Sequence, residues 1–250
     1  MGAAAEVYQR TRKRPDLFWN TYVCRPLAAV FVAAVKDTRI TPNQITIAAV
    51  AVAVFSAALL VGWPGYLGLV VAVVVYELSY VLDCADGMLA RWRNHQSTSG
   101  HLLDFLMDEI KAFVILAAVA TRLWREHHDE RYLLLGLAGL VCLSTGIALT
   151  TFQRRPEIAP PAAEPGAAAQ LGAAAQLGAA AQPASPLKRA VRLVERVAKF
   201  LIHYPSYILY VALSGHMEFF LLPYVAVNAL YAAKTFASVA LRFGRQASEG

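Results

Sequence analysis

A long stretch without a charged side chain is the feature that most constrains this chain. It runs from Ile40 to Tyr76 and is broken only by the turn-forming residues Gly62-Trp63-Pro64-Gly65. A helix needs about 20 apolar residues to cross roughly 30 Å of hydrocarbon, and each half of the stretch provides about that length. We therefore predict two adjacent membrane-spanning helices, near 43–62 and 66–88.

Four further segments extend this pattern. They are apolar over most of their length and cover 101–124, 132–153, 200–215 and 219–241. Only 16% of the residues are charged, whereas a soluble domain usually has about 25%. We predict an all-α polytopic membrane protein with six transmembrane helices. An N-terminal juxtamembrane amphipathic helix is expected within residues 15–36, because the apolar run there is too short to cross.

Basic residues predict the orientation of the chain. They concentrate in the N-terminal segment, the 83–100 loop, the 153–199 loop and the C-terminal tail, which places these parts in the cytoplasm. The formal net charge of +6 is attributed to this bias and to anionic lipid. We expect no nucleic-acid partner, because no basic run is interleaved with exposed aromatic residues. The plasma membrane is the expected location.

These observations divide the chain into four regions. The predicted regions are a cytoplasmic N-terminus with the interfacial helix (1–38), the first four spans (39–152), a cytoplasmic Ala/Pro-rich linker with a basic helix (153–199), and the last two spans with a C-terminal tail (200–250).

Four aspartates lie where the second expected span ends and the third begins. Asp83 and Asp86 are three residues apart, and Asp104 and Asp108 are four apart, so each pair shares one face of its helix. The short connection between the two helices favours antiparallel neighbours. If the third span begins near residue 100, Asp108 lies about 12 Å along it, deepest of the four.

Such a cluster requires positive charge. One buried acid at membrane depth costs roughly 2.5–3.5 kcal/mol, and four also repel one another. The local basic side chains are Arg91, with Arg93 and Lys111 further off, and we expect them not to neutralise the cluster. Divalent cations would do so, and oxygen-only ligands favour Mg²⁺, Mn²⁺ or Ca²⁺. Two ions about 3.5–4 Å apart would suit four carboxylates.

Small residues beside the acids indicate a ligand. Gly87 and Ala90 allow a bulky anion to approach the backbone closely, and the planar guanidinium of Arg91 suits phosphate. Carboxylate-held metal with arginine is suited to diphosphate chemistry. The sequence contains no glycine-rich Walker loop, which argues against ATP hydrolysis.

The combined pattern resembles that of a known family. DxxDGxxAR, eight residues, then GxxxDxxxD is similar to the signature of the class I CDP-alcohol phosphotransferases, membrane enzymes of phospholipid synthesis. Every position of this signature is filled here: Asp83, Asp86, Gly87, Ala90, Arg91, Gly100, Asp104 and Asp108. The resemblance covers residues 15–152 well.

The resemblance implies a set of roles. The four aspartates would ligate two Mg²⁺ or Mn²⁺ ions, with Asp108 also accepting a proton, and the enzyme would be a homodimer. The residues that would contact the CDP group are Asn43, Gln44, Thr46, Gly87, Arg91 and Ser97. An alcohol would attack a CDP-alcohol, with CDP-diacylglycerol the expected donor, and CMP would leave.

The acceptor stays open. The further basic motifs of the inositol-phosphate and glycerol-phosphate members are not clearly present. Arg154 and Arg155 are candidates for contact with the phosphate of an acceptor or lipid, although snorkelling to the membrane surface would also explain them. The alternative functions are a divalent-cation transporter and a non-catalytic membrane scaffold. The transporter would not require Gly87, Ala90 and Arg91 at fixed spacing, and an inactive scaffold would be free to lose the aspartates that are intact here.

Overall fold

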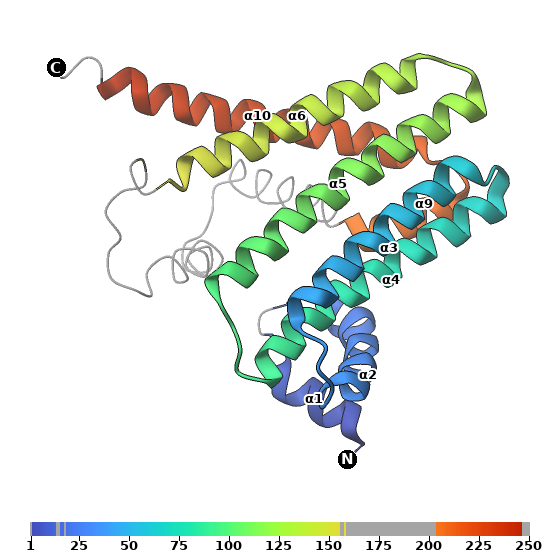
Figure 1. Ribbon diagram of the computed structural model, residues 1–250. Helices are drawn as coiled ribbons and strands as arrows, with labels where there is room; N and C mark the ends of the chain where they lie inside the picture. Colours follow the sequence, from blue (N-terminus) through green and yellow to red (C-terminus); the bar gives the residue numbers. More distant parts are fainter. Residues whose placement is uncertain (1, 14–15, 18, 156–157, 159–203, 247–250) are drawn as a thin grey trace, which may run out of the picture. The chain divides into compact units, whose positions relative to one another are not determined.

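Every regular element that the computed structural model describes is a helix (Figure 1). The described residues are 2–13, 16–17, 19–155, 158 and 204–246. In chain order the elements are α1 (Ala3–Thr11), the π-helical turn η1 (Asn20–Cys24), α2 (Arg25–Val35), α3 (Pro42–Gly62), α4 (Gly65–Trp92), α5 (Thr98–His127), α6 (Arg131–Gln153), α9 (Tyr204–Ser214) and α10 (Glu218–Gln246). The predicted all-α class is confirmed.

Two compact units make up the chain. The first comprises residues 1–140 and 203–222, and the second comprises 141–202 and 223–250. The boundary falls within α6 and within α10.

Four of the helices are long and apolar enough to cross a membrane. They are α3, α4, α6 and residues 218–243 of α10. The predicted count of six spans is therefore not confirmed by the described residues. The helix over the third expected span, α5, carries charged residues in its first half, and α9 has only 11 residues. The short apolar helix Asn20–Val35 occupies the predicted juxtamembrane segment, and its position at the membrane surface stays a prediction.

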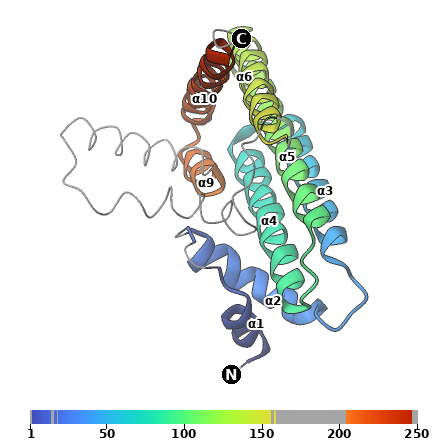
Figure 2. The ribbon, with the colours of Figure 1, turned by 90° about the vertical axis from the view of Figure 1, so that its left-hand side faces the viewer.

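Helices α3 and α4 form an antiparallel hairpin, and α3 also packs along α5 (Figures 1 and 2). A capping box starts α3: the Thr41 side chain accepts from the Gln44 backbone, and the Gln44 side chain accepts from the Thr41 backbone. The predicted turn ends the helix. Gly65 there has φ +80°, a left-handed conformation that favours glycine.

Arg122 of α5 fastens that turn. Its side chain is buried, and it donates hydrogen bonds to the carbonyl oxygens of Leu60 at 3.0 Å, Trp63 at 3.0 Å and Gly65 at 2.7 Å. Glu126 pairs with the same guanidinium at 2.6 Å. Carbonyl groups in the last turn of a helix have no partner within the helix, so this arginine satisfies those of Leu60 and Trp63 at the end of α3. Through Gly65 it also contacts the start of α4, and it thereby ties α5 to the hairpin.

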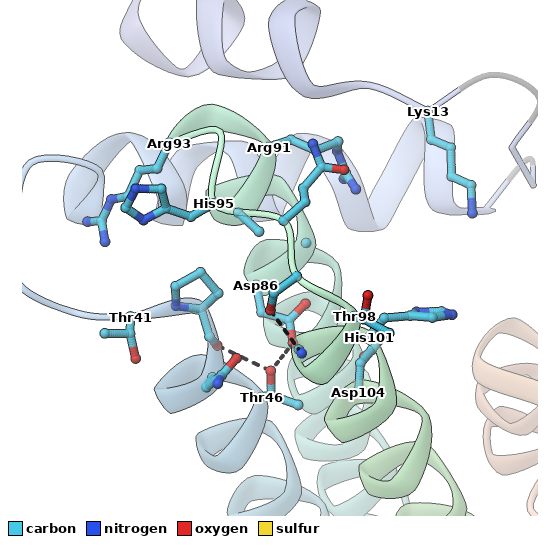
Figure 3. A pocket seen from close by; sticks show the side chains of 17 residues that line it. Lys13, Thr41, Thr46, Asp86, Arg91, Arg93, His95, Thr98, His101 and Asp104 are labelled. Carbon is cyan, nitrogen blue, oxygen red and sulfur yellow. Dashed lines mark hydrogen bonds between the residues drawn. The ribbon is translucent and has the colours of Figure 1, made fainter. Parts of the chain in front are cut away.

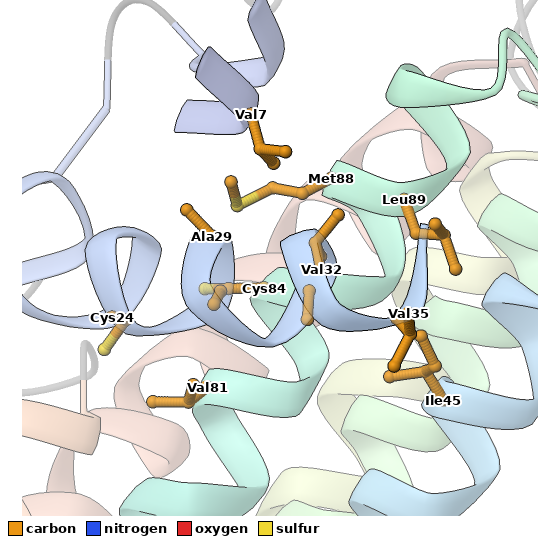
Figure 4. Close-up of a cluster of buried hydrophobic side chains, with 12 residues drawn as sticks. Val7, Cys24, Ala29, Val32, Val35, Ile45, Val81, Cys84, Met88 and Leu89 are labelled. Atoms are coloured by element: carbon orange, nitrogen blue, oxygen red, sulfur yellow. The ribbon is translucent and has the colours of Figure 1, made fainter. Parts of the chain in front are cut away.

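At the other end of the hairpin, α1 and α2 pack on α4. The buried side chains in this contact include Val7 of α1, Val32 of α2, and Met88 and Leu89 of α4 (Figure 4). These residues bring the N-terminal helices against the part of α4 that carries the acidic motif.

Arg93 fixes the segment between α2 and α3. Its guanidinium donates hydrogen bonds to the carbonyl oxygens of Val35 at 3.1 Å, Lys36 at 2.9 Å, Thr38 at 2.8 Å and Ile40 at 2.6 Å. The segment leads directly into the capping box of α3. One side chain from the end of α4 thereby sets where α3 begins.

Within the second unit, α6 and α10 contact through small and aromatic residues. The Thr150 and Tyr231 hydroxyls lie 2.9 Å apart, and the ring centroids of Phe152 and Phe243 are separated by 5.8 Å. Gly146 allows this approach, because a Cβ there would lie 3.0 Å from the Tyr231 ring. Of the region predicted as a linker with a basic helix (153–199), only residues 153–155 and 158 are among the described residues.

Candidate active site

Three of the four signature aspartates converge between α4 and α5. One carboxylate oxygen each from Asp83, Asp104 and Asp108 lies within 4.8 Å of the other two. The donor set is all oxygen and anionic, which is what Mg²⁺ and Mn²⁺ prefer. The residues therefore fit the metal centre that the sequence predicts, although the identity and the number of the ions are separate questions.

The ammonium group of Lys111 lies inside this acidic group. It forms ion pairs with Asp83 and with Asp108, the latter at 2.7 Å, and its side chain is only 4% exposed. Our prediction that Lys111 lies further off was wrong. The side chain of Asp108, predicted to lie deepest, is 53% exposed, and so is open to an incoming molecule.

The fourth aspartate has a different setting. Asp86 is buried and accepts a hydrogen bond from the hydroxyl of Thr46, which also contacts the Pro42 carbonyl oxygen at 3.2 Å. Asp86 is not part of the three-carboxylate group, but it borders the same cavity as Asp104 (Figure 3). Its role as a metal ligand stays a prediction.

A cavity of about 770 Å³ opens next to the acids. Five of the six residues predicted to contact the CDP group line it: Asn43, Thr46, Gly87, Arg91 and Ser97. The sixth, Gln44, is absent from the described lining and forms the capping box instead. Arg154 and Arg155 are exposed residues of the second unit, just after α6.

Sequence reasoning missed several residues of the cavity. Lys13 reaches it from the segment after α1, and Thr98 of α5 also lines it (Figure 3). The first turn of α5 follows directly from the signature spacing, so Thr98 could have been found. No sequence signal ties Lys13 to α4.

Two comparisons with known proteins bear on this arrangement. The sequence model of the CDP-alcohol phosphatidyltransferase family matches residues 39–214, which include α3, α4 and α5. The chain belongs to the CDP-alcohol phosphatidyltransferase family.

A curated relative is similar over a shorter region. The bifunctional IPC transferase and DIPP synthase of Archaeoglobus fulgidus is 29% identical over 105 residues, which cover 42% of this chain. The match spans only 20% of that relative. The resemblance to the CDP-alcohol family is confirmed.

Two glycines of this family member bring functional groups close together. At Gly87 a Cβ would lie 3.3 Å from Nη1 of Arg91, whose Nε donates to the Thr11 carbonyl oxygen at 2.8 Å. At Gly100 a Cβ would lie 3.0 Å from Oγ of Ser97, which accepts the Gly100 N–H. A larger residue at either position would displace a group that lines the cavity.

Proposed function

We propose that this phosphotransferase moves a substituted phosphate from a CDP-alcohol, with CDP-diacylglycerol as the donor, to an alcohol acceptor in phospholipid biosynthesis. CMP is the second product. The observation that carries the proposal is the 770 Å³ cavity, in which the acids Asp86 and Asp104 and the bases Lys13 and Arg91 share one lining. A nucleotide diphosphate needs this combination of room, metal ligands and basic groups.

The cavity residues divide into two roles. Asn43, Thr46 and Ser97 offer amide and hydroxyl groups that suit the cytidine and its ribose. The guanidinium of Arg91 is held by the Thr11 carbonyl oxygen through Nε, which leaves the two terminal nitrogens to meet the diphosphate. Gly87 keeps the space in front of them open.

The proposed metal ligands are the four aspartates, and the proposed ions are two Mg²⁺ or Mn²⁺. When bound, these ions supply positive charge that neutralises the diphosphate and the departing CMP. The four carboxylates position that charge beside the cavity, because α4 and α5 present them from facing helices.

We assign Asp108 as the base in the proposed chemical step. The acceptor hydroxyl oxygen attacks the phosphorus attached to the lipid or alcohol group, and a new P–O bond forms. The bond to the oxygen of CMP breaks, and CMP leaves with the electron pair. The hydroxyl proton passes to a carboxylate oxygen of Asp108, whose 53% exposed side chain an acceptor can reach.

Three further parts of the proposal concern the surroundings. Arg154 and Arg155 are proposed to contact the phosphate of the acceptor or of the lipid. The enzyme is proposed to act as a homodimer in the plasma membrane, with the cavity on the cytoplasmic side. This side agrees with the distribution of Lys and Arg in the sequence.

The test is release of CMP by the purified chain. CDP-diacylglycerol is supplied with inositol phosphate, glycerol phosphate, serine or inositol, with and without Mg²⁺. The rate of CMP release by Asp108→Asn should fall at least 100-fold. The matched control Asp37→Asn changes a side chain that is 85% exposed, and it should keep the wild-type rate. Normal turnover by Asp108→Asn would refute the assignment, and Mn²⁺ uptake into proteoliposomes without CMP release would favour a transporter.

A further inference from the structure

The position of Lys111 on α5 repeats the spacing of the acids. Residues 104, 108 and 111 follow one another by four and by three, so a single helical face carries two carboxylates and one ammonium. The third carboxylate, Asp83, faces them from α4. The ammonium contacts Asp83 and Asp108 together and is thereby shared between the two helices.

This lysine is buried to an unusual degree. Only 3% of the residue is exposed, and a buried ammonium is costly unless it is paired with negative charge. The same holds for the carboxylates, which repel one another when no cation is present. The ion pairs therefore balance both costs at once and link α4 to α5.

A metal ion at this site would use two of the same carboxylates. Asp83 and Asp108 are two of the three residues whose oxygens are close enough to share an ion. Both already bind the ammonium group, and a divalent ion held by these carboxylates would lie within a few ångströms of it. At an effective dielectric constant of about 20, charges at about 4 Å interact by several kcal/mol. The two cations therefore compete for these carboxylates.

We propose that Lys111 is a built-in counter-ion of the acidic site, which a divalent metal displaces when it binds. This inference rests on the metal centre of the proposed function. The lysine keeps the metal-free protein folded around its acids, and it weakens metal binding because each ion replaces an existing ion pair. The side chain at position 111 thus sets the metal concentration at which the site fills.

The experiment measures metal binding directly, without nucleotide. Lys111→Met removes the charge and keeps most of the volume, and Lys234→Met removes an equal charge from an exposed site on α10 as the control. Mn²⁺ titration followed by electron paramagnetic resonance gives the dissociation constant in detergent. Lys111→Met should bind Mn²⁺ at least tenfold more tightly than the wild type, and its metal-free form should melt at a lower temperature. Lys234→Met should match the wild type.

Two results would overturn the proposal. Equal or weaker Mn²⁺ binding by Lys111→Met would show that the lysine supports the ligands instead of competing with metal. Absence of Mn²⁺ binding from every variant would remove the metal site and the inference together. The Mn²⁺ titration contains no CDP-alcohol. Its result therefore does not depend on whether the chain releases CMP in the separate test of the proposed function.

The wild-type chain provides a second measurement in case Lys111→Met does not fold. Lysine side chains are methylated reductively with and without Mg²⁺, and each site is read by mass spectrometry. Displacement from the carboxylates should change the labelling of Lys111 at least severalfold, while Lys234 stays constant. Identical labelling of Lys111 with and without Mg²⁺, at a Mg²⁺ concentration that fully displaces bound Mn²⁺, would refute displacement of the lysine.

Discussion

Replacement of Gly87 by alanine separates the stability of α4 from the function of its cavity. Alanine is favoured over glycine by about 0.8–1 kcal/mol in a helix interior. The new Cβ would lie 3.3 Å from Nη1 of Arg91, a few tenths of an ångström too close, whereas its distance of 3.7 Å from Nη2 is ordinary contact. The guanidinium must therefore shift, and the hydrogen bond from its Nε to the Thr11 carbonyl oxygen limits how it can do so.

The expected result is a protein at least as stable as the wild type with impaired binding of its donor. A small displacement of a phosphate-binding guanidinium should lower kcat/KM for the CDP-alcohol about tenfold, equivalent to about 1.4 kcal/mol. We expect the loss chiefly in KM, measured as CMP release at varied donor concentration. Gly62→Ala is the control, since a Cβ there meets nothing within 4 Å. Wild-type kinetics in Gly87→Ala would refute the proposed role of the space between Gly87 and Arg91.

Three further substitutions test the packing around the site by thermal unfolding in detergent. Arg93→Met removes the hydrogen bonds from Arg93 to the carbonyl groups between α2 and α3. It should lower the free energy of unfolding by about 2 kcal/mol and raise the KM for the donor, and an unchanged melting temperature would contradict the role of Arg93 in fixing this segment. Gly136→Ala places a Cβ 2.4 Å from the Cβ of Ala120, so it should lower the free energy of unfolding by about 1–3 kcal/mol and leave the KM for the donor unchanged. Thr46→Val removes the hydroxyl that donates a hydrogen bond to Asp86, so it should lower the free energy of unfolding by about 1–3 kcal/mol. Thr46→Ser keeps a hydroxyl and should retain most of the stability.

Local patterns in the sequence predicted much of this architecture. The signature spacing places Asp83, Asp104 and Asp108 on the facing surfaces of two helices, and the structure brings them together. The capping box of Thr41 and Gln44 was not predicted, because Gln44 was assigned to the CDP group, although their spacing of three residues is typical of one. These features depend only on helix geometry, which a single sequence displays.

Other features depend on contacts between distant segments. The carbonyl oxygen of Thr11 holds Arg91 across 80 positions, and no periodicity in the short helix α1 announces that contact. Lys111 is a different case. Its place on the acidic face follows from the helical spacing. The prediction considered only its distance from the acids along the chain and therefore placed it too far away. The predicted third span is not confirmed at α5, because a helix with charged residues in its first half is too polar to be recognised by its apolar length.

The buried Arg122 has a consequence for how the protein is built. Its three carbonyl partners exist as a set only after α3 and α4 have turned back on each other at residues 63–65. Until then the guanidinium would have only Glu126 of its own helix as a partner, and a charged side chain at membrane depth is costly. Synthesis from the N-terminus delivers the hairpin before α5 emerges. Biogenesis should therefore proceed by insertion of the hairpin first, with α5 retained at the translocon until its arginine can dock.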